Sequence, residues 1–363
     1  MKKSRLRAHF AAILIGTSSL IVANGAKVLQ SAGPLAFAPG GVLIVADPKA
    51  AALVSLKTGD SAGSANDKVN ISGINGKIAG LLGTSPDAIR IIDLAVNPES
   101  HHAYLSVARG RGAEASAVIV KANGDGELSV VDLDAADVST VSLPSAPADA
   151  ETGSGRRRSN KRLESITDIS VVDGNVIVAG LSNEEFASTL RSVPFPFKAA
   201  TKGASVEIYH GAHGRFETRS PIRTFVPYSI EGESHILAAY TCTPLVKVPV
   251  AQLKPGAHVK GTTIAELGNR NRPLDMLVYN KSGKDWFLMA NSSRGVMKIS
   301  TNDLAGAPSI TSRVGGGGIQ GQAFETIKSW ENVFQLAEYD SKQALLIQGG
   351  DNGALNLVSV EYP

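Results

Sequence analysis

A short pair of β-strands recurs six times along this chain, and the repetition constrains the fold more than any other feature. Each copy has an apolar run, a turn and a second apolar run, and the second runs are centred near residues 44, 105, 178, 238, 288 and 346. Most copies add a third strand, such as 52–56 or 295–299. A sheet unit that recurs at nearly constant phase is typical of radial β architecture. Such a fold gathers one set of loops around a common axis.

The spacing of the copies predicts an all-β fold, a six-bladed β-propeller formed by a single domain over 26–363. The interval of 50 to 73 residues exceeds a minimal blade of about 40–50 residues, and the excess falls in loop insertions near 61–88, 144–163 and 181–204. A seven-bladed propeller, with a further blade in 61–88, and a β-sandwich are the alternatives. We expect 26–29 to pair with 356–360 and close the ring. Short helices are expected at 77–82 and 183–191.

The first 25 residues have the features of a signal peptide. A basic start precedes an apolar stretch over 10–22, and small residues at 23–25 suit cleavage. The alternative is an uncleaved anchor. No uninterrupted apolar segment of 18 residues follows, so the sequence predicts an exported, soluble protein, periplasmic or extracellular, with no transmembrane segment after cleavage.

Removal of that segment leaves a chain that is close to neutral. It takes away 4 of the 36 basic residues and leaves 32 against 33 acidic ones. Without a broad basic field, the composition argues against nucleic-acid binding. Five of the remaining cations lie in one predicted inter-blade loop: Arg156, Arg157, Arg158, Lys161 and Arg162. This run is either a solvated insertion or a docking patch for an acidic partner or membrane headgroups.

Propeller geometry brings two groups of polar residues to the channel mouth. Asp93, Asp168 and Asp275 begin first strands, and such carboxylates suit calcium or another divalent metal, although Asp at a strand entrance also caps turns. The second group follows the second strands and predicts a site for a small ligand or a protein partner. Its members are Asp47, Arg109, Arg111, Glu184, Glu185, Cys242, Asn291, Arg294 and Asp351. The arginines among them suit a carboxylate or phosphate group.

The segments 272–278, 284–291 and 295–299 together resemble one blade of the NHL-repeat and gluconolactonase-like six-bladed propellers. In that family a Pro-Asp-Gly turn opens the inner strand, and its aspartate can be a metal ligand. Asp275 matches that position, whereas Asp93 and Asp168 match it less closely. Met276 replaces the family's glycine, and the family's glutamate and asparagine ligands have no clear counterparts. The resemblance implies the propeller fold and, as an alternative function, a divalent-metal-dependent lactonase or esterase.

Cys242 is the single cysteine, so an intrachain disulfide is impossible. It is either a soft metal ligand, a thiol that links a partner, or a buried structural thiol. His210 and His213 have a separation compatible with metal binding, but we expect them near the rim, as polar turn residues.

Signatures of several enzyme classes are missing, including the Gly-x-Ser-x-Gly elbow and the phosphate loop. The leading hypothesis is therefore an exported propeller that binds a small ligand or protein partner at its channel face. The metal-dependent hydrolase is the second hypothesis. The third is a structural or assembly propeller without a small-molecule site.

Overall fold

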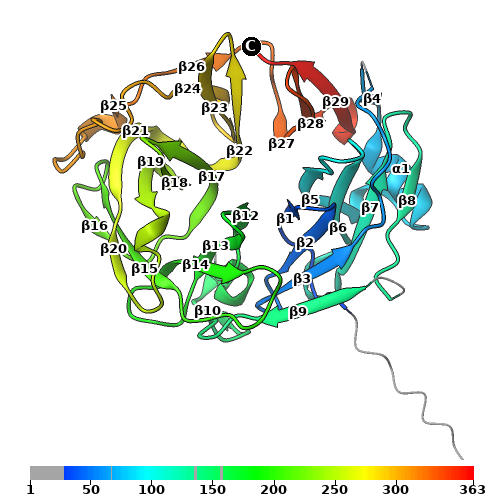
Figure 1. The fold of residues 1–363 in the computed structure, drawn as a ribbon, viewed down its shortest axis with the longest axis horizontal. Helices are drawn as coiled ribbons and strands as arrows, with labels where there is room; N and C mark the ends of the chain where they lie inside the picture. The colour runs from blue at the N-terminus through cyan, green and yellow to red at the C-terminus, as the bar shows by residue number, and fades with distance from the viewer. Residues whose placement is uncertain (1–27, 67, 135–136, 156–157) are drawn as a thin grey trace, which may run out of the picture.

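The computed structural model describes residues 28–363 except 67, 135–136 and 156–157, and in it six β-sheets stand around a central channel (Figure 1). Each blade is named here after its innermost strand. From the channel outward, the β1 blade consists of β1 (Leu35–Ala38), β2 (Val42–Asp47), β3 (Ala52–Lys57) and β9 (Val138–Ser142). The β5 blade consists of β5 (Ile89–Val96), β6 (Ala103–Arg109), β7 (Ser116–Ala122) and β8 (Leu128–Val130). The β12 blade consists of β12 (Asp168–Val172), β13 (Asn175–Leu181), β14 (Ser188–Pro194), β15 (Ala204–His210) and β16 (Arg215–Glu217), with β20 (His258–Lys260) beside β15.

The other three blades follow the same plan. The β17 blade consists of β17 (Ile222–Ile230), β18 (Glu233–Tyr240), β19 (Cys242–Pro249), β21 (Thr262–Asn271) and β25 (Ile319–Gly321). The β22 blade consists of β22 (Pro273–Lys281), β23 (Lys284–Asn291), β24 (Gly295–Ser300) and β26 (Phe324–Ile327). The β27 blade consists of β27 (Val333–Glu338), β28 (Gln343–Gly349), β29 (Leu355–Glu361) and β4 (Asn70–Ile71). The predicted six-bladed propeller is confirmed, and the seven-bladed alternative is wrong for the part of the chain that the structure describes. The signal peptide predicted for 1–25 lies outside that part.

Local sequence explains the hairpins that build the blades. Asp173 and Gly174 join β12 to β13 and have positive φ values of 48° and 73°. A two-residue hairpin turn needs positive φ at both positions, which Asp-Gly and Asn-Gly pairs adopt most easily. The strands themselves are nearly continuous apolar runs because neighbouring blades cover both faces of each sheet.

The blades do not follow one another around the ring in sequence order. The β5 blade lies between the β27 and β1 blades, and the β1 blade contacts the β12 blade on its other side (Figure 1). The chain therefore runs from the β1 blade to the β5 blade and then returns. On its return it adds β9 to the edge of the β1 blade through pairing with β3.

The ring is closed by a different segment from the one expected. Asn70 and Ile71 pair with Val358 and Leu357, so the closing strand is β4 and not 26–29. Within 26–29, the described residues Val28 and Leu29 instead pack into the apolar cluster between the β1 and β5 blades. The strand β4 completes the last blade because the chain passes that blade on its way to β5.

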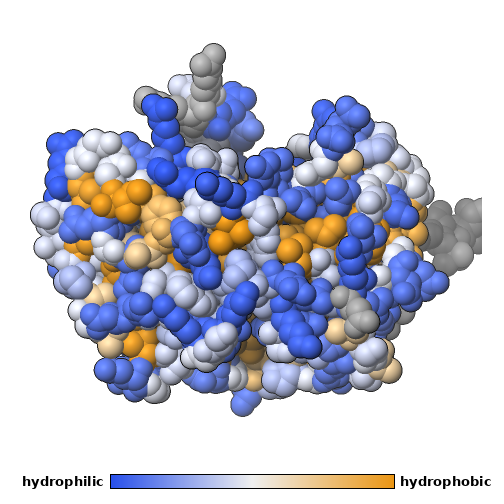
Figure 2. All heavy atoms as spheres, turned by 90° about the horizontal axis from the view of Figure 1, so that it is seen from above, coloured by the Kyte–Doolittle hydropathy of each residue, from blue (hydrophilic) through white to orange (hydrophobic). Residues whose placement is uncertain are grey.

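The apolar core is divided among the seams between blades. Six clusters are found in the described residues, and each one joins two neighbouring blades. Seen edge-on, the rim exposes many hydrophilic side chains with apolar patches between them (Figure 2). Side-chain packing between blades therefore supplies most of the buried apolar area.

Two predicted helices have different outcomes. The expected helix at 77–82 is present as α1 (Ile74–Leu81). The helix expected at 183–191 is wrong, because Ser188–Pro194 forms β14 and pairs along the whole of β13. Part of the predicted 181–204 insertion is therefore a third strand, whereas 144–163 carries the small hairpin of β10 (Glu151–Thr152) and β11 (Ser159–Asn160). No helix among the described residues has the length and apolar character needed to cross a membrane.

Candidate functional site

The three aspartates predicted at the strand entrances meet at the channel. Asp93, Asp168 and Asp275 line one cavity of about 170 Å³ together with first-strand residues of several blades. They stand on the β5, β12 and β22 blades, which are alternate blades around the ring. This volume is below the roughly 300–1,000 Å³ typical of small-molecule pockets.

Each of these carboxylates joins its own blade to the next one. One oxygen accepts a hydrogen bond from a backbone N–H on the first strand of the neighbouring blade. The pairs are Leu35 with Asp93 at 2.6 Å, Phe225 with Asp168 at 2.8 Å, and Leu336 with Asp275 at 2.7 Å. In Asp168 and Asp275 the other oxygen accepts the N–H of the next residue, at 2.8 Å in both cases. The aspartates thus have a structural role at every second seam.

Burial changes the acidity of all three groups. It raises the pKa of Asp168 to about 7 and, with the Asp168 carboxylate, the pKa of Asp93 to about 8. Burial and the Asp93 carboxylate hold the pKa of Asp275 well above its ordinary value. In the described part of the chain these aspartates are not a group whose ligand oxygens all lie within 4.8 Å of one another. Their binding of calcium or another metal stays a prediction.

The nine predicted ligand-binding residues lie at or soon after the ends of second strands, but none of them lines the channel cavity. Several hold local structure instead. Asp47 is 1% exposed and accepts hydrogen bonds from Ser31 Oγ at 2.7 Å and from the backbone N–H of Ala50 at 3.0 Å. Arg111 forms an exposed ion pair with Asp87 at 2.6 Å.

The other predicted residues are spread over several blades. Glu184 pairs with Lys202 at 3.0 Å. Arg294 donates from Nη2 to the carbonyl of Asn269 at 3.3 Å. Asn291 is buried, whereas the remaining three are exposed: Arg109, Glu185 and Asp351. A common ligand site formed by all nine at the channel mouth stays a prediction, and only Cys242 among them joins a compact cluster.

In the described part of the basic run, 158–162, the three basic side chains contact other residues of the protein. Arg158 lies 3.2 Å from Glu151, and Lys161 lies 3.0 Å from Glu164. Arg162 donates to the carbonyl of Lys49 at 3.2 Å, which fixes the run to the β1 blade. Arg156 and Arg157 lie outside the described residues. Docking of a partner through this run stays a prediction.

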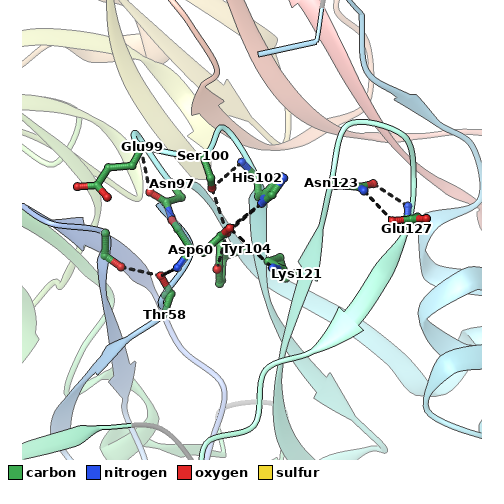
Figure 3. Close-up of polar contacts among 11 residues, drawn as sticks. Thr58, Asp60, Asn97, Glu99, Ser100, His102, Tyr104, Lys121, Asn123 and Glu127 are labelled. Carbon is green, nitrogen blue, oxygen red and sulfur yellow. Dashed lines mark hydrogen bonds and ion pairs between the residues drawn. The ribbon is translucent and has the colours of Figure 1, made fainter. Parts of the chain in front are cut away.

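A hub around Asp60 fixes the segment that leaves the β1 blade (Figure 3). The Asp60 carboxylate accepts hydrogen bonds from Nδ1 of His102 at 2.9 Å, from Oη of Tyr104 at 2.8 Å and from Oγ of Ser100 at 3.0 Å. These donors lie on or near β6. The hub therefore attaches the segment after β3 to the β5 blade, and the His102 side chain takes part in this attachment.

The most compact cluster of metal-ligand side chains joins His210, His213 and Cys242. One ligand atom from each lies within 4.8 Å of the other two, and no other group of three or more His, Cys, Asp or Glu in the described chain does the same. His210 ends β15, His213 lies in the following turn, and Cys242 begins β19 on the next blade. The cluster thus spans the seam between the β12 and β17 blades.

The two imidazoles are oriented by one carboxylate. Nδ1 of His210 lies 3.0 Å from Oε2 of Glu217, and Nδ1 of His213 lies 2.6 Å from Oε1 of the same residue. Hydrogen bonds from His210 and His213 lower the pKa of Glu217 to about 2. Since Nδ1 is engaged in both rings, Nε2 is the free ligand atom of each. Nε2 of His210 is buried and has no hydrogen-bond partner.

Sequence reasoning placed these residues apart. The expected position near the rim is right, but His210 is 3% exposed and ends β15, so its interpretation as a surface turn residue is wrong. The hairpin that contains it joins β15 to β16 at the outer edge of its blade and packs against the β17 blade. The His-x-x-His spacing was the available signal. Its third member, Cys242, comes from another blade, and only the packing of the two blades brings it near.

Comparison with known proteins finds only distant structural similarity. No protein-family model and no curated protein matches the sequence. The PQQ-bound aldose sugar dehydrogenase from Streptomyces coelicolor is 10% identical, with 92% of this chain and 94% of that chain covered and a TM-score of 0.34. Hydrazine synthase from Kuenenia stuttgartiensis is 10% identical, with 93% and 98% covered and a TM-score of 0.40. At this similarity the activities of these proteins do not transfer to the chain.

Proposed function

We propose that this propeller binds one transition-metal ion, zinc by its donor set, through His210, His213 and Cys242. Two observations carry the proposal: Nε2 of His210 is buried and unpartnered, and one ring nitrogen of His210 lies within 4.8 Å of ligand atoms of His213 and Cys242. A buried polar atom without a partner is costly, and an ion at this position would compensate that cost.

The chemistry of the three side chains fits zinc better than calcium. Imidazole nitrogen and thiolate sulfur are typical zinc ligands, whereas calcium prefers oxygen. Glu217 completes the arrangement, because histidines that bind metals usually donate their other ring N–H to a carboxylate. Three protein ligands leave a fourth zinc position for water or another small ligand, as in catalytic zinc sites.

The proposal changes the location of the metal predicted from the sequence. The channel aspartates already accept backbone hydrogen bonds, and they present oxygen alone. The seam cluster offers two kinds of softer donor. Export to the periplasm or the extracellular space, predicted from the first 25 residues, remains part of the proposal, and such a location would expose the site to extracytoplasmic zinc.

Calorimetric titration of metal-free protein with zinc and with calcium tests the proposal. We expect one zinc ion per chain, loss of binding in His210→Ala and Cys242→Ala, and no calcium binding at this site. His258→Ala is a matched control, since His258 lies 3.7 Å from a carboxylate of Glu207 on the same blade but outside the cluster. Wild-type protein that does not bind zinc, or a His210→Ala variant that binds it normally, would overturn the proposal.

A further inference from the structure

A second unpartnered group lies against the loop that carries the two histidines. Glu266, on β21, is 0% exposed, and its Oε1 accepts the backbone N–H of Gly211 at 2.6 Å. Its Oε2 is buried and has no hydrogen-bond partner. A buried carboxylate with an unused oxygen is unfavourable unless a proton donor or a cation faces it.

Glu266 is placed by the same two segments that hold the proposed metal ligands. Gly211 lies between the two histidines, and a Cβ there would stand 2.8 Å from Oε1 of Glu266, so glycine permits the close approach. On its own blade Glu266 is opposite Pro244, two residues after Cys242. Cys242 and Glu266 of the β17 blade therefore both approach the segment 210–213 across the seam to the β12 blade.

The distances separate the role of Glu266 from that of a ligand. Its oxygens are not among the atoms that lie within 4.8 Å of one another in the described cluster. It is a carboxylate beside the site and outside the ligand set. A carboxylate in that position suits proton transfer to and from a water molecule at the open position of the ion.

We propose that the seam site hydrolyses esters, with Glu266 as the proton-transfer residue; this inference rests on the proposed zinc binding. His210, His213 and Cys242 would hold the ion, which would supply polarisation of a water molecule. Glu266 would accept a proton from that water as the water oxygen forms a bond to the ester carbonyl carbon. The bond from that carbon to the leaving oxygen then breaks, and Glu266 returns the proton to the leaving oxygen. One ester and one water give one acid and one alcohol, so the step needs no other reactant.

Access to the site is consistent with an external substrate. The His213 side chain is 45% exposed and Cys242 is partly exposed, whereas His210 and Glu266 are buried. One side of the cluster thus faces solvent and the other faces the seam. A carbonyl compound would approach from the side of His213, while Glu266 acts from within.

Hydrolysis of p-nitrophenyl acetate by the zinc-loaded full chain tests the inference, with zinc stoichiometry measured on the same samples. We expect Glu266→Gln to bind zinc as the wild type does and to lose at least about 100-fold in kcat/KM, the scale of general acid–base catalysis. Glu207→Gln, which changes a partly buried carboxylate of the neighbouring blade, is expected to leave both values unchanged.

The outcomes separate the two proposals. Absence of zinc binding in the wild type contradicts the proposed function itself. Zinc binding without ester hydrolysis overturns the proposed hydrolysis, and full hydrolysis by zinc-loaded Glu266→Gln overturns the role of Glu266. Neither outcome contradicts zinc binding. If Glu266→Gln does not fold, Glu266→Asp keeps the charge and withdraws it by one methylene. That variant should retain zinc and lose at least about 10-fold in kcat/KM, and undiminished turnover would contradict the inference.

Discussion

Nδ1 of His210 lies 3.0 Å from Oε2 of Glu217, and this contact leaves the buried Nε2 of the same ring without a partner beside His213 and Cys242. Glu217 holds His213 in the same way. Glu217→Gln keeps the shape but weakens the acceptor, so we expect zinc affinity to fall about 10- to 100-fold. Competition with a chromogenic chelator measures the change.

Glu207→Gln is the matched control for Glu217. Glu207 also lies near a histidine and a lysine, at 3.7 Å from His258 and 3.3 Å from Lys260, but it is not a member of the cluster. Its replacement should leave zinc affinity unchanged. Equal losses in the two variants would mean that Glu217 acts through general stability and not through the orientation of the histidines.

The raised pKa values of the channel aspartates predict how the free energy of unfolding depends on pH. Their pKa values are raised by burial in the folded protein, to about 8 for Asp93 and about 7 for Asp168, so the folded state binds more protons than the unfolded state above pH 4. The free energy of unfolding should therefore fall as pH rises from about 5 to about 8. Glu338, which also lines the cavity and has a raised pKa, acts in the same direction.

Urea unfolding at several pH values measures this effect. The window from pH 5 to 8 lies above the range where carboxylates with lowered pKa, such as Asp60, are titrated. Asp93→Asn removes one of the groups and should flatten the decrease. A wild-type stability that rises over the same window would show that the aspartates are ionised in the folded protein without a penalty.

Asp275→Ala separates the structural aspartates from the metal site. The change leaves the N–H groups of Met276 and Leu336 without their acceptor, and each buried unsatisfied group costs about 1–3 kcal/mol. We expect a loss of at least about 2 kcal/mol in the free energy of unfolding and an unchanged zinc stoichiometry. Loss of one bound calcium ion instead would support the channel metal site predicted from the sequence.

The closing strand β4 provides a test of the ring. Ile71 is 4% exposed and pairs with Leu357 of the last blade. Ile71→Ala should cost about 2–5 kcal/mol, as for other buried isoleucines. Val130→Ala is the control, because Val130 is 45% exposed at the edge of its blade. Similar small losses in both variants would argue against closure through β4.

The sequence was sufficient for the number of blades because each hairpin depends on local signals. The turn at Asp173 and Gly174 and the apolar runs on either side specify their own pairing. The order of the blades depends on long crossings, and no local pattern shows that β9 returns to pair with β3. For the same reason no local pattern shows that Asn70 and Ile71 pair with the last blade.

In the candidate site, too, features set by local sequence could be predicted, and contacts between blades could not. The aspartates at 93, 168 and 275 could be placed at the channel because their position within each repeat is constant. The alternation of aspartate-bearing blades could not, since it requires the true ring order. The contact of Cys242 with His210 and His213 depends on the seam between two blades, which sequence spacing does not encode.

X-ray absorption at the zinc edge of the zinc-loaded protein tests the central claim most directly. The account predicts one sulfur neighbour at about 2.3 Å, two imidazole nitrogens at about 2.0–2.1 Å and one further light atom. The sulfur neighbour should disappear in Cys242→Ala. A spectrum with oxygen neighbours only, or one that Cys242→Ala leaves unchanged, would contradict a metal site formed by His210, His213 and Cys242.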